Sequence, residues 1–290
     1  MSIVVNLNGE ILPASEARLS VFDRGFLYGD SVYETIRVYT GRAFMLDEHL
    51  RRLRHSADLI GIAMPGEASS MAAEVKRAVA ASGEPDAAVR LMVTRGEGGI
   101  NPLPEPGLRP NLVVIVRPFE RLPEEAYHAG VAAVVVKTQR NAPRALDPNI
   151  KSGNFLNNIL AAREAAAAGA YEGLMLSAEG LVTEGTTSNV FVVKAGQVAT
   201  PDDRVGLLRG ITRDVLFGLA ARQGFEIEVR DVKERELREA DEVFVTSTLK
   251  EVLPITRLDG LSVGDGKAGS ITRSLYEAYR EVVEEFKTAR

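Results

Sequence analysis

The stretch NIKSGNFLNNILAAREA, residues 149–165, places a lysine shortly before a predicted helix. Small and amide side chains follow Lys151, among them Ser152, Gly153 and Asn154. Such a composition is expected where a cofactor or substrate packs close to the backbone. A lysine acts as a Schiff-base nucleophile only when its surroundings lower its pKa, whereas a lysine near a helix start is more often solvated. Other parts of the chain must therefore decide between these two interpretations.

The composition is that of a globular protein and excludes several functional classes. The chain has 290 residues, enough for one large domain or two ordinary ones, and 45% of them are hydrophobic. A net charge of −5 argues against nucleic acid or an anionic membrane as partner. With no cysteine and three histidines, we expect no metal centre. The chain shows neither a signal peptide nor a run of about 20 apolar residues, so we expect a cytoplasmic protein.

Turn signals and hydrophobic periodicity predict an α+β fold. The Asn8-Gly9 pair lies between alternating apolar residues and predicts a first hairpin, and Thr40-Gly41 predicts a second. A helix is expected to follow, with Asp47 as its N-cap. Further along, helical stretches alternate with short apolar strands, and no repeat or low-complexity segment interrupts them.

Proline and charged residues interrupt the periodic pattern in RPFERLPEEAYHAG, residues 117–130. Such an interruption is typical of a domain boundary. We therefore predict a small α+β domain over residues 1–120, a linker over 121–128, and a large domain over 129–290.

The stretch GLVTEGTTSNVFVV, residues 180–193, contains a second candidate. Glu184 falls between two strand-like pieces and precedes a glycine and three hydroxyl residues. One interpretation is a surface glutamate in a loop. The other is a carboxylate directed into a pocket, where it holds a proton on a ring nitrogen.

Three further elements suit a phosphate group. In GITRDVL, residues 210–216, a glycine allows close approach to the backbone and a helix then begins at a threonine, and helix N-termini bind phosphate well. VTSTLKE, residues 245–251, supplies more hydroxyl groups at the end of a buried strand. Arg52 shares a helix face with His49 and Ser56 and could form a fork onto a phosphate, although a solvated surface arginine is the default.

Together these elements indicate one chemistry. A Schiff-base lysine, a carboxylate for a pyridine nitrogen, and a phosphate site of helix N-terminus, hydroxyls and arginine are the parts that pyridoxal 5′-phosphate requires.

The chain resembles the class IV aminotransferases, the fold-type IV pyridoxal-phosphate enzymes. The resemblance covers nearly the whole chain and rests on six blocks in the family's order. The blocks are SVFDRGFLYGDSVYETIR, LDEHLRRLRHSA, IKSGNFLNNILAAREA, EGTTSNVF, GITRD and DEVFVTST.

The resemblance implies a role for each matching residue. Lys151 matches the lysine that attaches the cofactor, and Glu184 the carboxylate paired with the pyridine nitrogen. The matching phosphate ligands are Arg52, Ile211, Thr212 and Thr248, and Leu208 matches the apolar residue packed under the cofactor ring.

The resemblance also implies an architecture and a reaction. The family has a small α+β N-terminal domain and a larger C-terminal domain with a barrel-like β core, and the cofactor lies between them. It forms homodimers in which the partner chain completes the pocket, and Tyr28 matches the position that reaches across. The implied reaction is ping-pong transamination between an amino acid and a 2-oxo acid.

The substrate class rests on weaker matches. Arg90 and Arg37 match arginines of branched-chain enzymes, and Tyr33 fits either the branched-chain or the D-amino-acid type. Branched-chain enzymes usually carry tyrosines at the positions of Ala88 and Phe155, and both are absent here. The implied substrates are a branched-chain L-amino acid with 2-oxoglutarate or L-glutamate.

Three alternatives remain open from the sequence. The first is a D-amino-acid aminotransferase with an atypical carboxylate site. The loop after VTRG reads EGGINPLPEPG and lacks the arginine and histidine typical of those enzymes, so Arg90 or Lys250 would have to replace them. The second is an aminodeoxychorismate lyase, for which no positive mark is found. The third is a non-enzymatic binding protein, which both Lys151 and Glu184 argue against.

Overall fold

The structure is a computed structural model that describes residues 3–289. The described chain divides into two compact units. The first comprises the residues up to Glu120 together with Ile150–Asn154. The second comprises Arg121–Asn149 and the residues from Phe155 onward.

The first unit is built on one antiparallel sheet of six strands. Its strand order is β2-β1-β6-β5-β3-β4. The strands are β1 (Val4–Leu7), β2 (Glu10–Pro13), β3 (Ser31–Tyr39), β4 (Arg42–Ala43), β5 (Ala87–Thr94) and β6 (Asn111–Pro118).

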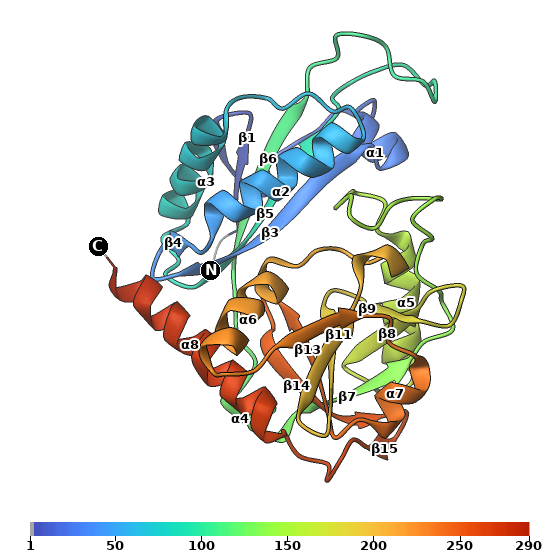
Figure 1. Ribbon diagram of the computed structural model, residues 1–290. Coiled ribbons are helices and arrows are strands. Elements are labelled where there is room, and N and C mark those ends of the chain that lie inside the picture. Colours follow the sequence, from blue (N-terminus) through green and yellow to red (C-terminus); the bar gives the residue numbers. More distant parts are fainter. Residues whose placement is uncertain (1–2, 290) are drawn as a thin grey trace. The chain divides into compact units, whose positions relative to one another are not determined.

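Two helices cover one face of this sheet and enclose the core of the first unit (Figure 1). They are α2 (Leu46–Leu59) and α3 (Ala68–Ser82), and a short helix α1 (Arg24–Tyr28) precedes β3. Side chains alternate along a strand, so only every second β3 residue enters this core: Val32, Ile36 and Val38 do. Glu34 lies among them on the same face, which makes a buried carboxylate there conspicuous.

Both predicted hairpin turns are confirmed. Asn8 and Gly9 connect β1 to β2 with φ angles of 53° and 95°. Thr40 and Gly41 connect β3 to β4 with φ angles of 50° and 74°. Left-handed conformations at both turn positions are those of the tightest hairpin turns, in which asparagine and glycine are favoured.

The predicted N-cap of α2 is wrong. The helix begins at Leu46, and its cap is Met45 in a left-handed conformation with no side-chain hydrogen bond. Strand β4 ends at Ala43, two residues before Met45, so the chain enters the helix earlier than the side-chain pattern indicates. Asp47 instead lies in the first turn, where a negative charge interacts favourably with the helix dipole.

The second unit contains a sheet of nine strands. They are β7 (Val131–Val135), β8 (Glu172–Leu176), β9 (Val182–Gly185), β10 (Asn189–Lys194), β11 (Gln197–Pro201), β12 (Ile227–Arg230), β13 (Glu242–Ser247), β14 (Glu251–Leu258) and β15 (Leu261–Ser262). Strand β10 pairs with β13 on one side and with β9 on the other. The path β10-β13-β14-β7-β8-β9 therefore closes on itself, which is the expected barrel-like core.

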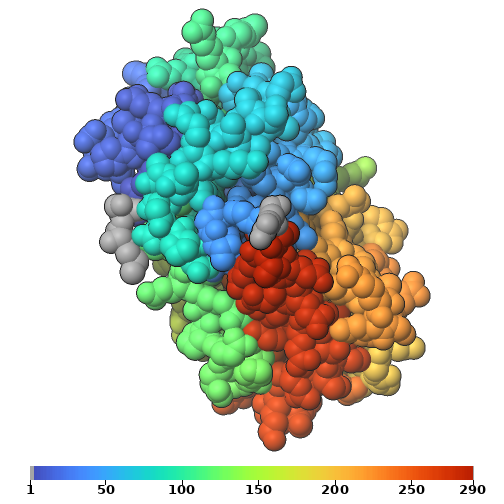
Figure 2. All heavy atoms as spheres, turned by 90° about the vertical axis from the view of Figure 1, so that its left-hand side faces the viewer, coloured from blue at the N-terminus to red at the C-terminus, as the bar shows by residue number. Residues whose placement is uncertain are grey.

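Helices surround this closed sheet (Figure 1). They are α4 (Glu124–Ala129), α5 (Leu156–Ala167), α6 (Ile211–Arg222), α7 (Glu234–Glu239) and α8 (Ser270–Thr288), with a 3₁₀ turn at Asp203–Val205. Figure 2 shows α8 in red along the surface of its unit. This helix buries Leu275, Tyr276 and Tyr279 on one side and exposes charged residues on the other. No helix within residues 3–289 is long and apolar enough to cross a membrane.

The compact units differ from the predicted domains in two segments. Residues 150–154, expected in the large domain, pack with the first unit because Ser152 forms a β-bridge with Val32. Residues 121–128, expected as a linker, belong to the second unit and contain most of α4. The functional division into a small domain and a cofactor-binding domain stays a prediction.

Candidate active site

Lys151 is held by backbone contacts within the first unit. The N–H of Tyr33 donates to the Lys151 carbonyl at 2.9 Å, and the Lys151 N–H donates to the Ser56 hydroxyl at 3.1 Å. The lysine is thus fixed between β3 and α2, and its side chain is half-buried. This environment differs from that of an ordinary solvated lysine.

The Tyr33 ring contacts two cationic side chains. Lys151 Nζ lies 4.6 Å from the ring centroid, and the Arg90 guanidinium carbon lies 3.9 Å from it. The strand register explains the second contact, because Arg90 on β5 pairs with Thr35, two residues from Tyr33 on the same face of β3. Arg90 itself is exposed, so its guanidinium remains accessible.

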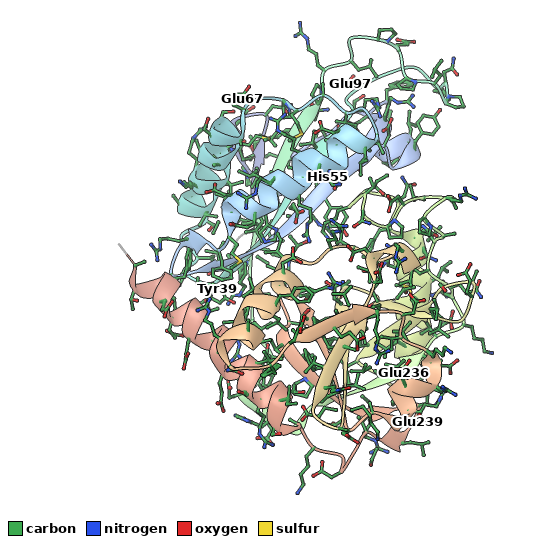
Figure 3. All side chains as sticks on the ribbon, in the orientation of Figure 1. Tyr39, His55, Glu67, Glu97, Glu236 and Glu239 are labelled. Carbon is green, nitrogen blue, oxygen red and sulfur yellow. The ribbon has the colours of Figure 1, made fainter. Side chains whose placement is uncertain are left out.

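Arg37 is engaged in a structural network. Its guanidinium donates to the Val38 and Ala87 carbonyls and to the Asp86 carboxylate at 2.6 to 3.0 Å. It also lies 4.6 Å from the ring centroid of Tyr39, which is labelled in Figure 3. Because the side chain is buried and its donors are used, these contacts argue against the predicted substrate role of Arg37.

Arg52 forms a bidentate pair with Glu34. Its Nε and Nη2 donate to the two carboxylate oxygens at 2.7 Å each, and His49 Nδ1 lies 2.7 Å from Oε2. Burial alone would raise the pKa of Glu34, but Arg52 and His49 hold it well below its usual range. Burial also lowers the pKa of His49 despite the neighbouring carboxylate.

Glu184 is a buried carboxylate at the end of β9 in the second unit, not a solvated loop residue. Its Oε1 accepts a hydrogen bond from Arg140 Nε at 2.6 Å, and its Oε2 accepts one from the Leu208 N–H at 3.0 Å. Arg140 was not predicted, because its context TQRNAPRALD carries no recognisable motif. The Arg140 N–H donates to the Leu176 carbonyl of β8, which pairs with β9, the strand of Glu184.

The N-terminus of α6 carries two predicted phosphate ligands. The helix begins at Ile211 after Gly210, without a side-chain hydrogen bond to its first turn. A Cβ at Gly210 would lie 1.9 Å from the Asn189 side-chain oxygen, so this approach requires glycine. The buried Thr212 also shares a hydrogen bond with Tyr279. The helix therefore begins one residue before Thr212, the predicted start, and the phosphate ligands stay a prediction.

Strand pairing gathers the other cofactor candidates of this unit. Glu184 pairs with Asn189, which in turn pairs with Thr246, so the three lie in a row across β9, β10 and β13. Asn189 was also missed from the sequence; it donates to the Leu208 carbonyl at 2.8 Å. Thr248 follows two residues beyond Thr246, in the turn after β13. One end of these strands therefore carries the predicted carboxylate, apolar residue and hydroxyl.

Lys250 forms an ion pair with the fully buried Glu172 and also donates to the Thr187 hydroxyl at 2.6 Å. Burial would raise the pKa of Glu172, but Lys250 and hydrogen bonds from hydroxyl groups lower it. The lysine therefore compensates a buried charge. This pairing argues against its predicted role as a substrate ligand.

Tyr28 ends helix α1, where it is 37% exposed. The Arg24 guanidinium lies 4.7 Å from its ring centroid and also donates to the Asn101 and Pro102 carbonyls at 2.7 and 2.8 Å. Large apolar side chains near Tyr28 are also exposed. They are Leu19, Val21, Phe22 and Phe26.

The residues present fit pyridoxal 5′-phosphate. Arg52 and the N-terminus of α6 suit a phosphate group, and the buried Glu184 suits a protonated ring nitrogen. In addition, the hydroxyl of Thr246, the third residue of the row that Glu184 begins, is buried without a hydrogen-bond partner among residues 3–289. The same residues contain no cluster of histidine, aspartate and glutamate suited to a metal ion.

Comparisons with known proteins agree with this chemistry. The chain matches the family amino-transferase class IV over residues 31–258. It is 37% identical to a putative branched-chain-amino-acid aminotransferase of Methanocaldococcus jannaschii, with 96% of each chain covered. It is 36% identical to a D-alanine aminotransferase of Bacillus licheniformis, again with 96% of each covered.

The fold is that of solved enzymes with the same chemistry. The branched-chain amino acid aminotransferase of Thermobaculum terrenum, solved in its PLP form, superposes with a TM-score of 0.88. It is 32% identical, and the match covers 97% of this chain and 94% of the other. The chain therefore belongs to the class IV aminotransferases and is a transaminase that depends on pyridoxal 5′-phosphate.

Proposed function

We propose that this transaminase exchanges the amino group between a branched-chain L-amino acid and 2-oxoglutarate. The observation that carries this proposal is the Tyr33 ring, which contacts Lys151 Nζ at 4.6 Å and the Arg90 guanidinium at 3.9 Å. The two cations are thus separated by no more than the sum of these distances. An amino acid whose amino group reacts near Lys151 has its carboxylate within reach of Arg90.

Arg90 is proposed as the ligand of the substrate carboxylate. Of the three cations predicted to bind substrate, Arg90 is the exposed one. Arg37 donates to the Ala87 carbonyl, and Lys250 pairs with the buried Glu172. A guanidinium forms two parallel hydrogen bonds with a carboxylate, which fixes both position and orientation. Ala88 and Phe155, where branched-chain enzymes usually carry tyrosines, would then leave the side-chain pocket more apolar.

Lys151 is proposed to attach the cofactor and to carry the proton during transfer. When bound, pyridoxal 5′-phosphate supplies an electron sink for the carbanion formed at the substrate Cα. Lys151, freed by the substrate, removes the Cα proton and returns it on the cofactor side as general acid and base. Its backbone hydrogen bonds to Tyr33 and Ser56 fix the main chain from which the amine would reach that carbon.

The other cofactor contacts are proposed from the local geometry of each unit. Glu184 would hold the proton of the pyridine nitrogen, and Leu208, whose N–H already donates to Glu184, would pack under the ring. The proposed phosphate ligands are Arg52, Ile211, Thr212 and Thr248. The larger second unit is accordingly proposed as the main cofactor-binding domain.

We also propose a homodimer in the cytoplasm. The exposed apolar side chains near Tyr28 support this, because a monomer rarely leaves several large apolar residues exposed together. Tyr28 would then reach the active site of the partner chain. Sedimentation of the purified protein tests the dimer, and Phe26→Glu is expected to shift it toward the monomer.

The proposed substrate class is tested by half-reactions followed by absorbance. Purified holoenzyme is mixed separately with L-leucine, L-glutamate and D-alanine, and loss of the visible cofactor band is recorded. Fast loss with both L-amino acids supports the proposal. In the same assay, Lys151→Ala is expected to lose the lysine-linked band and at least about a thousandfold in turnover. A fully active variant contradicts the role of Lys151.

A D-amino-acid aminotransferase is the second candidate. It is favoured by the similarity to the D-alanine aminotransferase of Bacillus licheniformis, which is 36% identical, nearly as similar as the branched-chain relative. Loss of the band with D-alanine alone would select this candidate. The roles of Lys151 and Glu184 would be unchanged, since both substrate classes use the same proton transfer.

A further inference from the structure

The first unit contains a buried carboxylate for which the transamination chemistry gives no direct use. Glu34 is fully buried on β3, among apolar residues that form the core. A charge in such a position is costly unless it is paired and hydrogen-bonded. Arg52 and His49 provide those partners from one helix, α2, at 2.7 Å for each of the three contacts.

The pairing fixes the plane of the Arg52 guanidinium. The Nε and Nη2 edge of the fork lies on the two oxygens of Glu34. A guanidinium is planar and has donors on more than one edge, so fixing one edge also sets the direction of the others. A long arginine side chain otherwise loses rotamer entropy when it binds a ligand. Here that freedom is already removed by Glu34.

His49 holds the carboxylate from the other side. Its Nδ1 faces Oε2 of Glu34, and because an ionised carboxylate can only accept, this nitrogen carries a proton and donates it. Its Nε2 is buried and has no hydrogen-bond partner among the described residues. By contrast, His55 on the same helix, which is labelled in Figure 3, is exposed. His49 therefore serves Glu34 alone, which keeps the carboxylate in place independently of Arg52.

We propose that Glu34, held by His49, is a positioning residue that orients the Arg52 guanidinium toward the phosphate group of the cofactor. The inference rests on the proposed role of Arg52 as a phosphate ligand. It assigns a role in cofactor binding to a buried carboxylate that makes three hydrogen-bond contacts. It also adds two residues, Glu34 and His49, to those that support the phosphate site.

A purely structural ion pair predicts the opposite sign. The charge of Glu34 opposes a phosphate dianion, so its removal should strengthen phosphate binding if orientation is unimportant. If orientation is the main contribution, its removal should weaken phosphate binding despite the more favourable charge. Replacement of Glu34 by glutamine distinguishes the two explanations, because it keeps the shape of the side chain and removes its charge.

The experiment compares two ligands on the full-length chain after the cofactor has been removed. The dissociation constants of pyridoxal 5′-phosphate and of pyridoxal, which lacks the phosphate, are measured by spectroscopic titration. The preference for the phosphorylated ligand, the dissociation constant of pyridoxal divided by that of pyridoxal 5′-phosphate, reports the phosphate contact separately from the ring and aldehyde contacts. For Glu34→Gln we expect this ratio to fall about tenfold to a hundredfold, as for a lost charged hydrogen bond. An unchanged or increased ratio overturns the proposal.

Glu48→Gln is the matched control. Glu48 lies beside His49 on α2 and forms an exposed pair with Arg51 at 3.2 Å. The variant removes a carboxylate charge from the helix that carries Arg52 and His49. We expect the ligand ratio to stay within about twofold of the wild type, since exposed pairs contribute little. An effect as large as that of Glu34→Gln would show that the ratio responds to the loss of any nearby negative charge. This outcome would overturn the proposal.

Two more variants complete the test. Glu34→Asp is the alternative if Glu34→Gln does not fold. It keeps the buried charge but withdraws the carboxylate by one carbon, so we expect a lower ligand ratio, and a wild-type ratio overturns the proposal.

Arg52→Gln tests the proposed function itself. If it leaves the ratio unchanged, Arg52 is not a phosphate ligand. If it lowers the ratio while both Glu34 variants keep it, only the inference about Glu34 fails.

Discussion

Arg140 Nε donates to Glu184 Oε1 at 2.6 Å, and the two side chains are only 10% and 6% exposed. The second oxygen of the carboxylate accepts the Leu208 N–H at 3.0 Å. Each oxygen therefore has its own donor, from a different segment of the second unit. This arrangement fixes the carboxylate in position and compensates its charge before any cofactor binds.

Arg140→Met is expected to destabilise the protein markedly. Removal of one partner leaves Glu184 buried and without its cationic partner, which costs about 3–5 kcal/mol in comparable pairs. Urea unfolding of the cofactor-free protein at pH 7 measures this loss. Arg140→Lys keeps the charge and should lose less. A loss below about 1 kcal/mol for Arg140→Met would show that water or another group compensates the carboxylate.

Arg90→Ala is expected to impair amino acids selectively. Loss of a bidentate contact to the carboxylate should raise KM for L-leucine about tenfold to a hundredfold. An amine without a carboxylate should show little change, because it never makes the contact. Steady-state kinetics with both substrates measure the difference. Arg117→Ala, an exposed arginine on the neighbouring β6, is the control. Equal effects on both substrates would remove Arg90 from the site.

Local signals predicted the features that depend on a few neighbouring residues. The Asn8-Gly9 turn follows from the preference of both residues for left-handed conformations, and the structure confirms it. The helix start at Gly210 and Ile211 is likewise local. Lys151 was also recognisable as a candidate site residue, since small and amide residues follow it.

The partners of buried charges were not predictable in the same way. Arg140 meets Glu184 across 44 positions, and Lys250 meets Glu172 across 78. Which residues meet over such separations is decided by strand pairing, and no short motif encodes it. For this reason the pairing of Lys250 with Glu172 was not foreseen, and Arg140 was missed.

Lys250→Met is expected to destabilise the protein in a pH-dependent way. In the wild type, Lys250 holds the pKa of Glu172 below its ordinary value, so the pair stabilises the fold above that value. Without the lysine, burial is expected to raise the pKa of Glu172, and the fold then favours the protonated acid. The difference from wild type should be about 3–5 kcal/mol at pH 7 and should shrink on acidification.

Urea unfolding at several pH values measures this difference. Lys194→Met removes an exposed lysine paired with Asp241 and should change stability by less than about 0.5 kcal/mol at any pH. KM for amino acids should be unchanged in Lys250→Met. A raised KM with unaltered stability would instead restore Lys250 as a substrate ligand.

Gly153→Ala is expected to displace Lys151. The added Cβ would lie 2.3 Å from the Ser31 hydroxyl and 3.2 Å from the Gly29 carbonyl oxygen, so the segment must move away from β3. Overpacking of this kind costs about 1–3 kcal/mol, and a shift of about 1 Å at a reacting group lowers turnover by about a hundredfold. Both effects are measurable by urea unfolding and by kcat.

The origin of the effect is tested by relieving the nearest clash. Gly153→Ala combined with Ser31→Ala removes the hydroxyl that the new methyl group meets, and should recover most of kcat. Gly218→Ala lies within α6, where a Cβ meets no atom within 4 Å, and should leave turnover unchanged while stabilising the helix by about 1 kcal/mol. If the double variant is as slow as Gly153→Ala alone, the close approach to Ser31 is not what holds Lys151 in place.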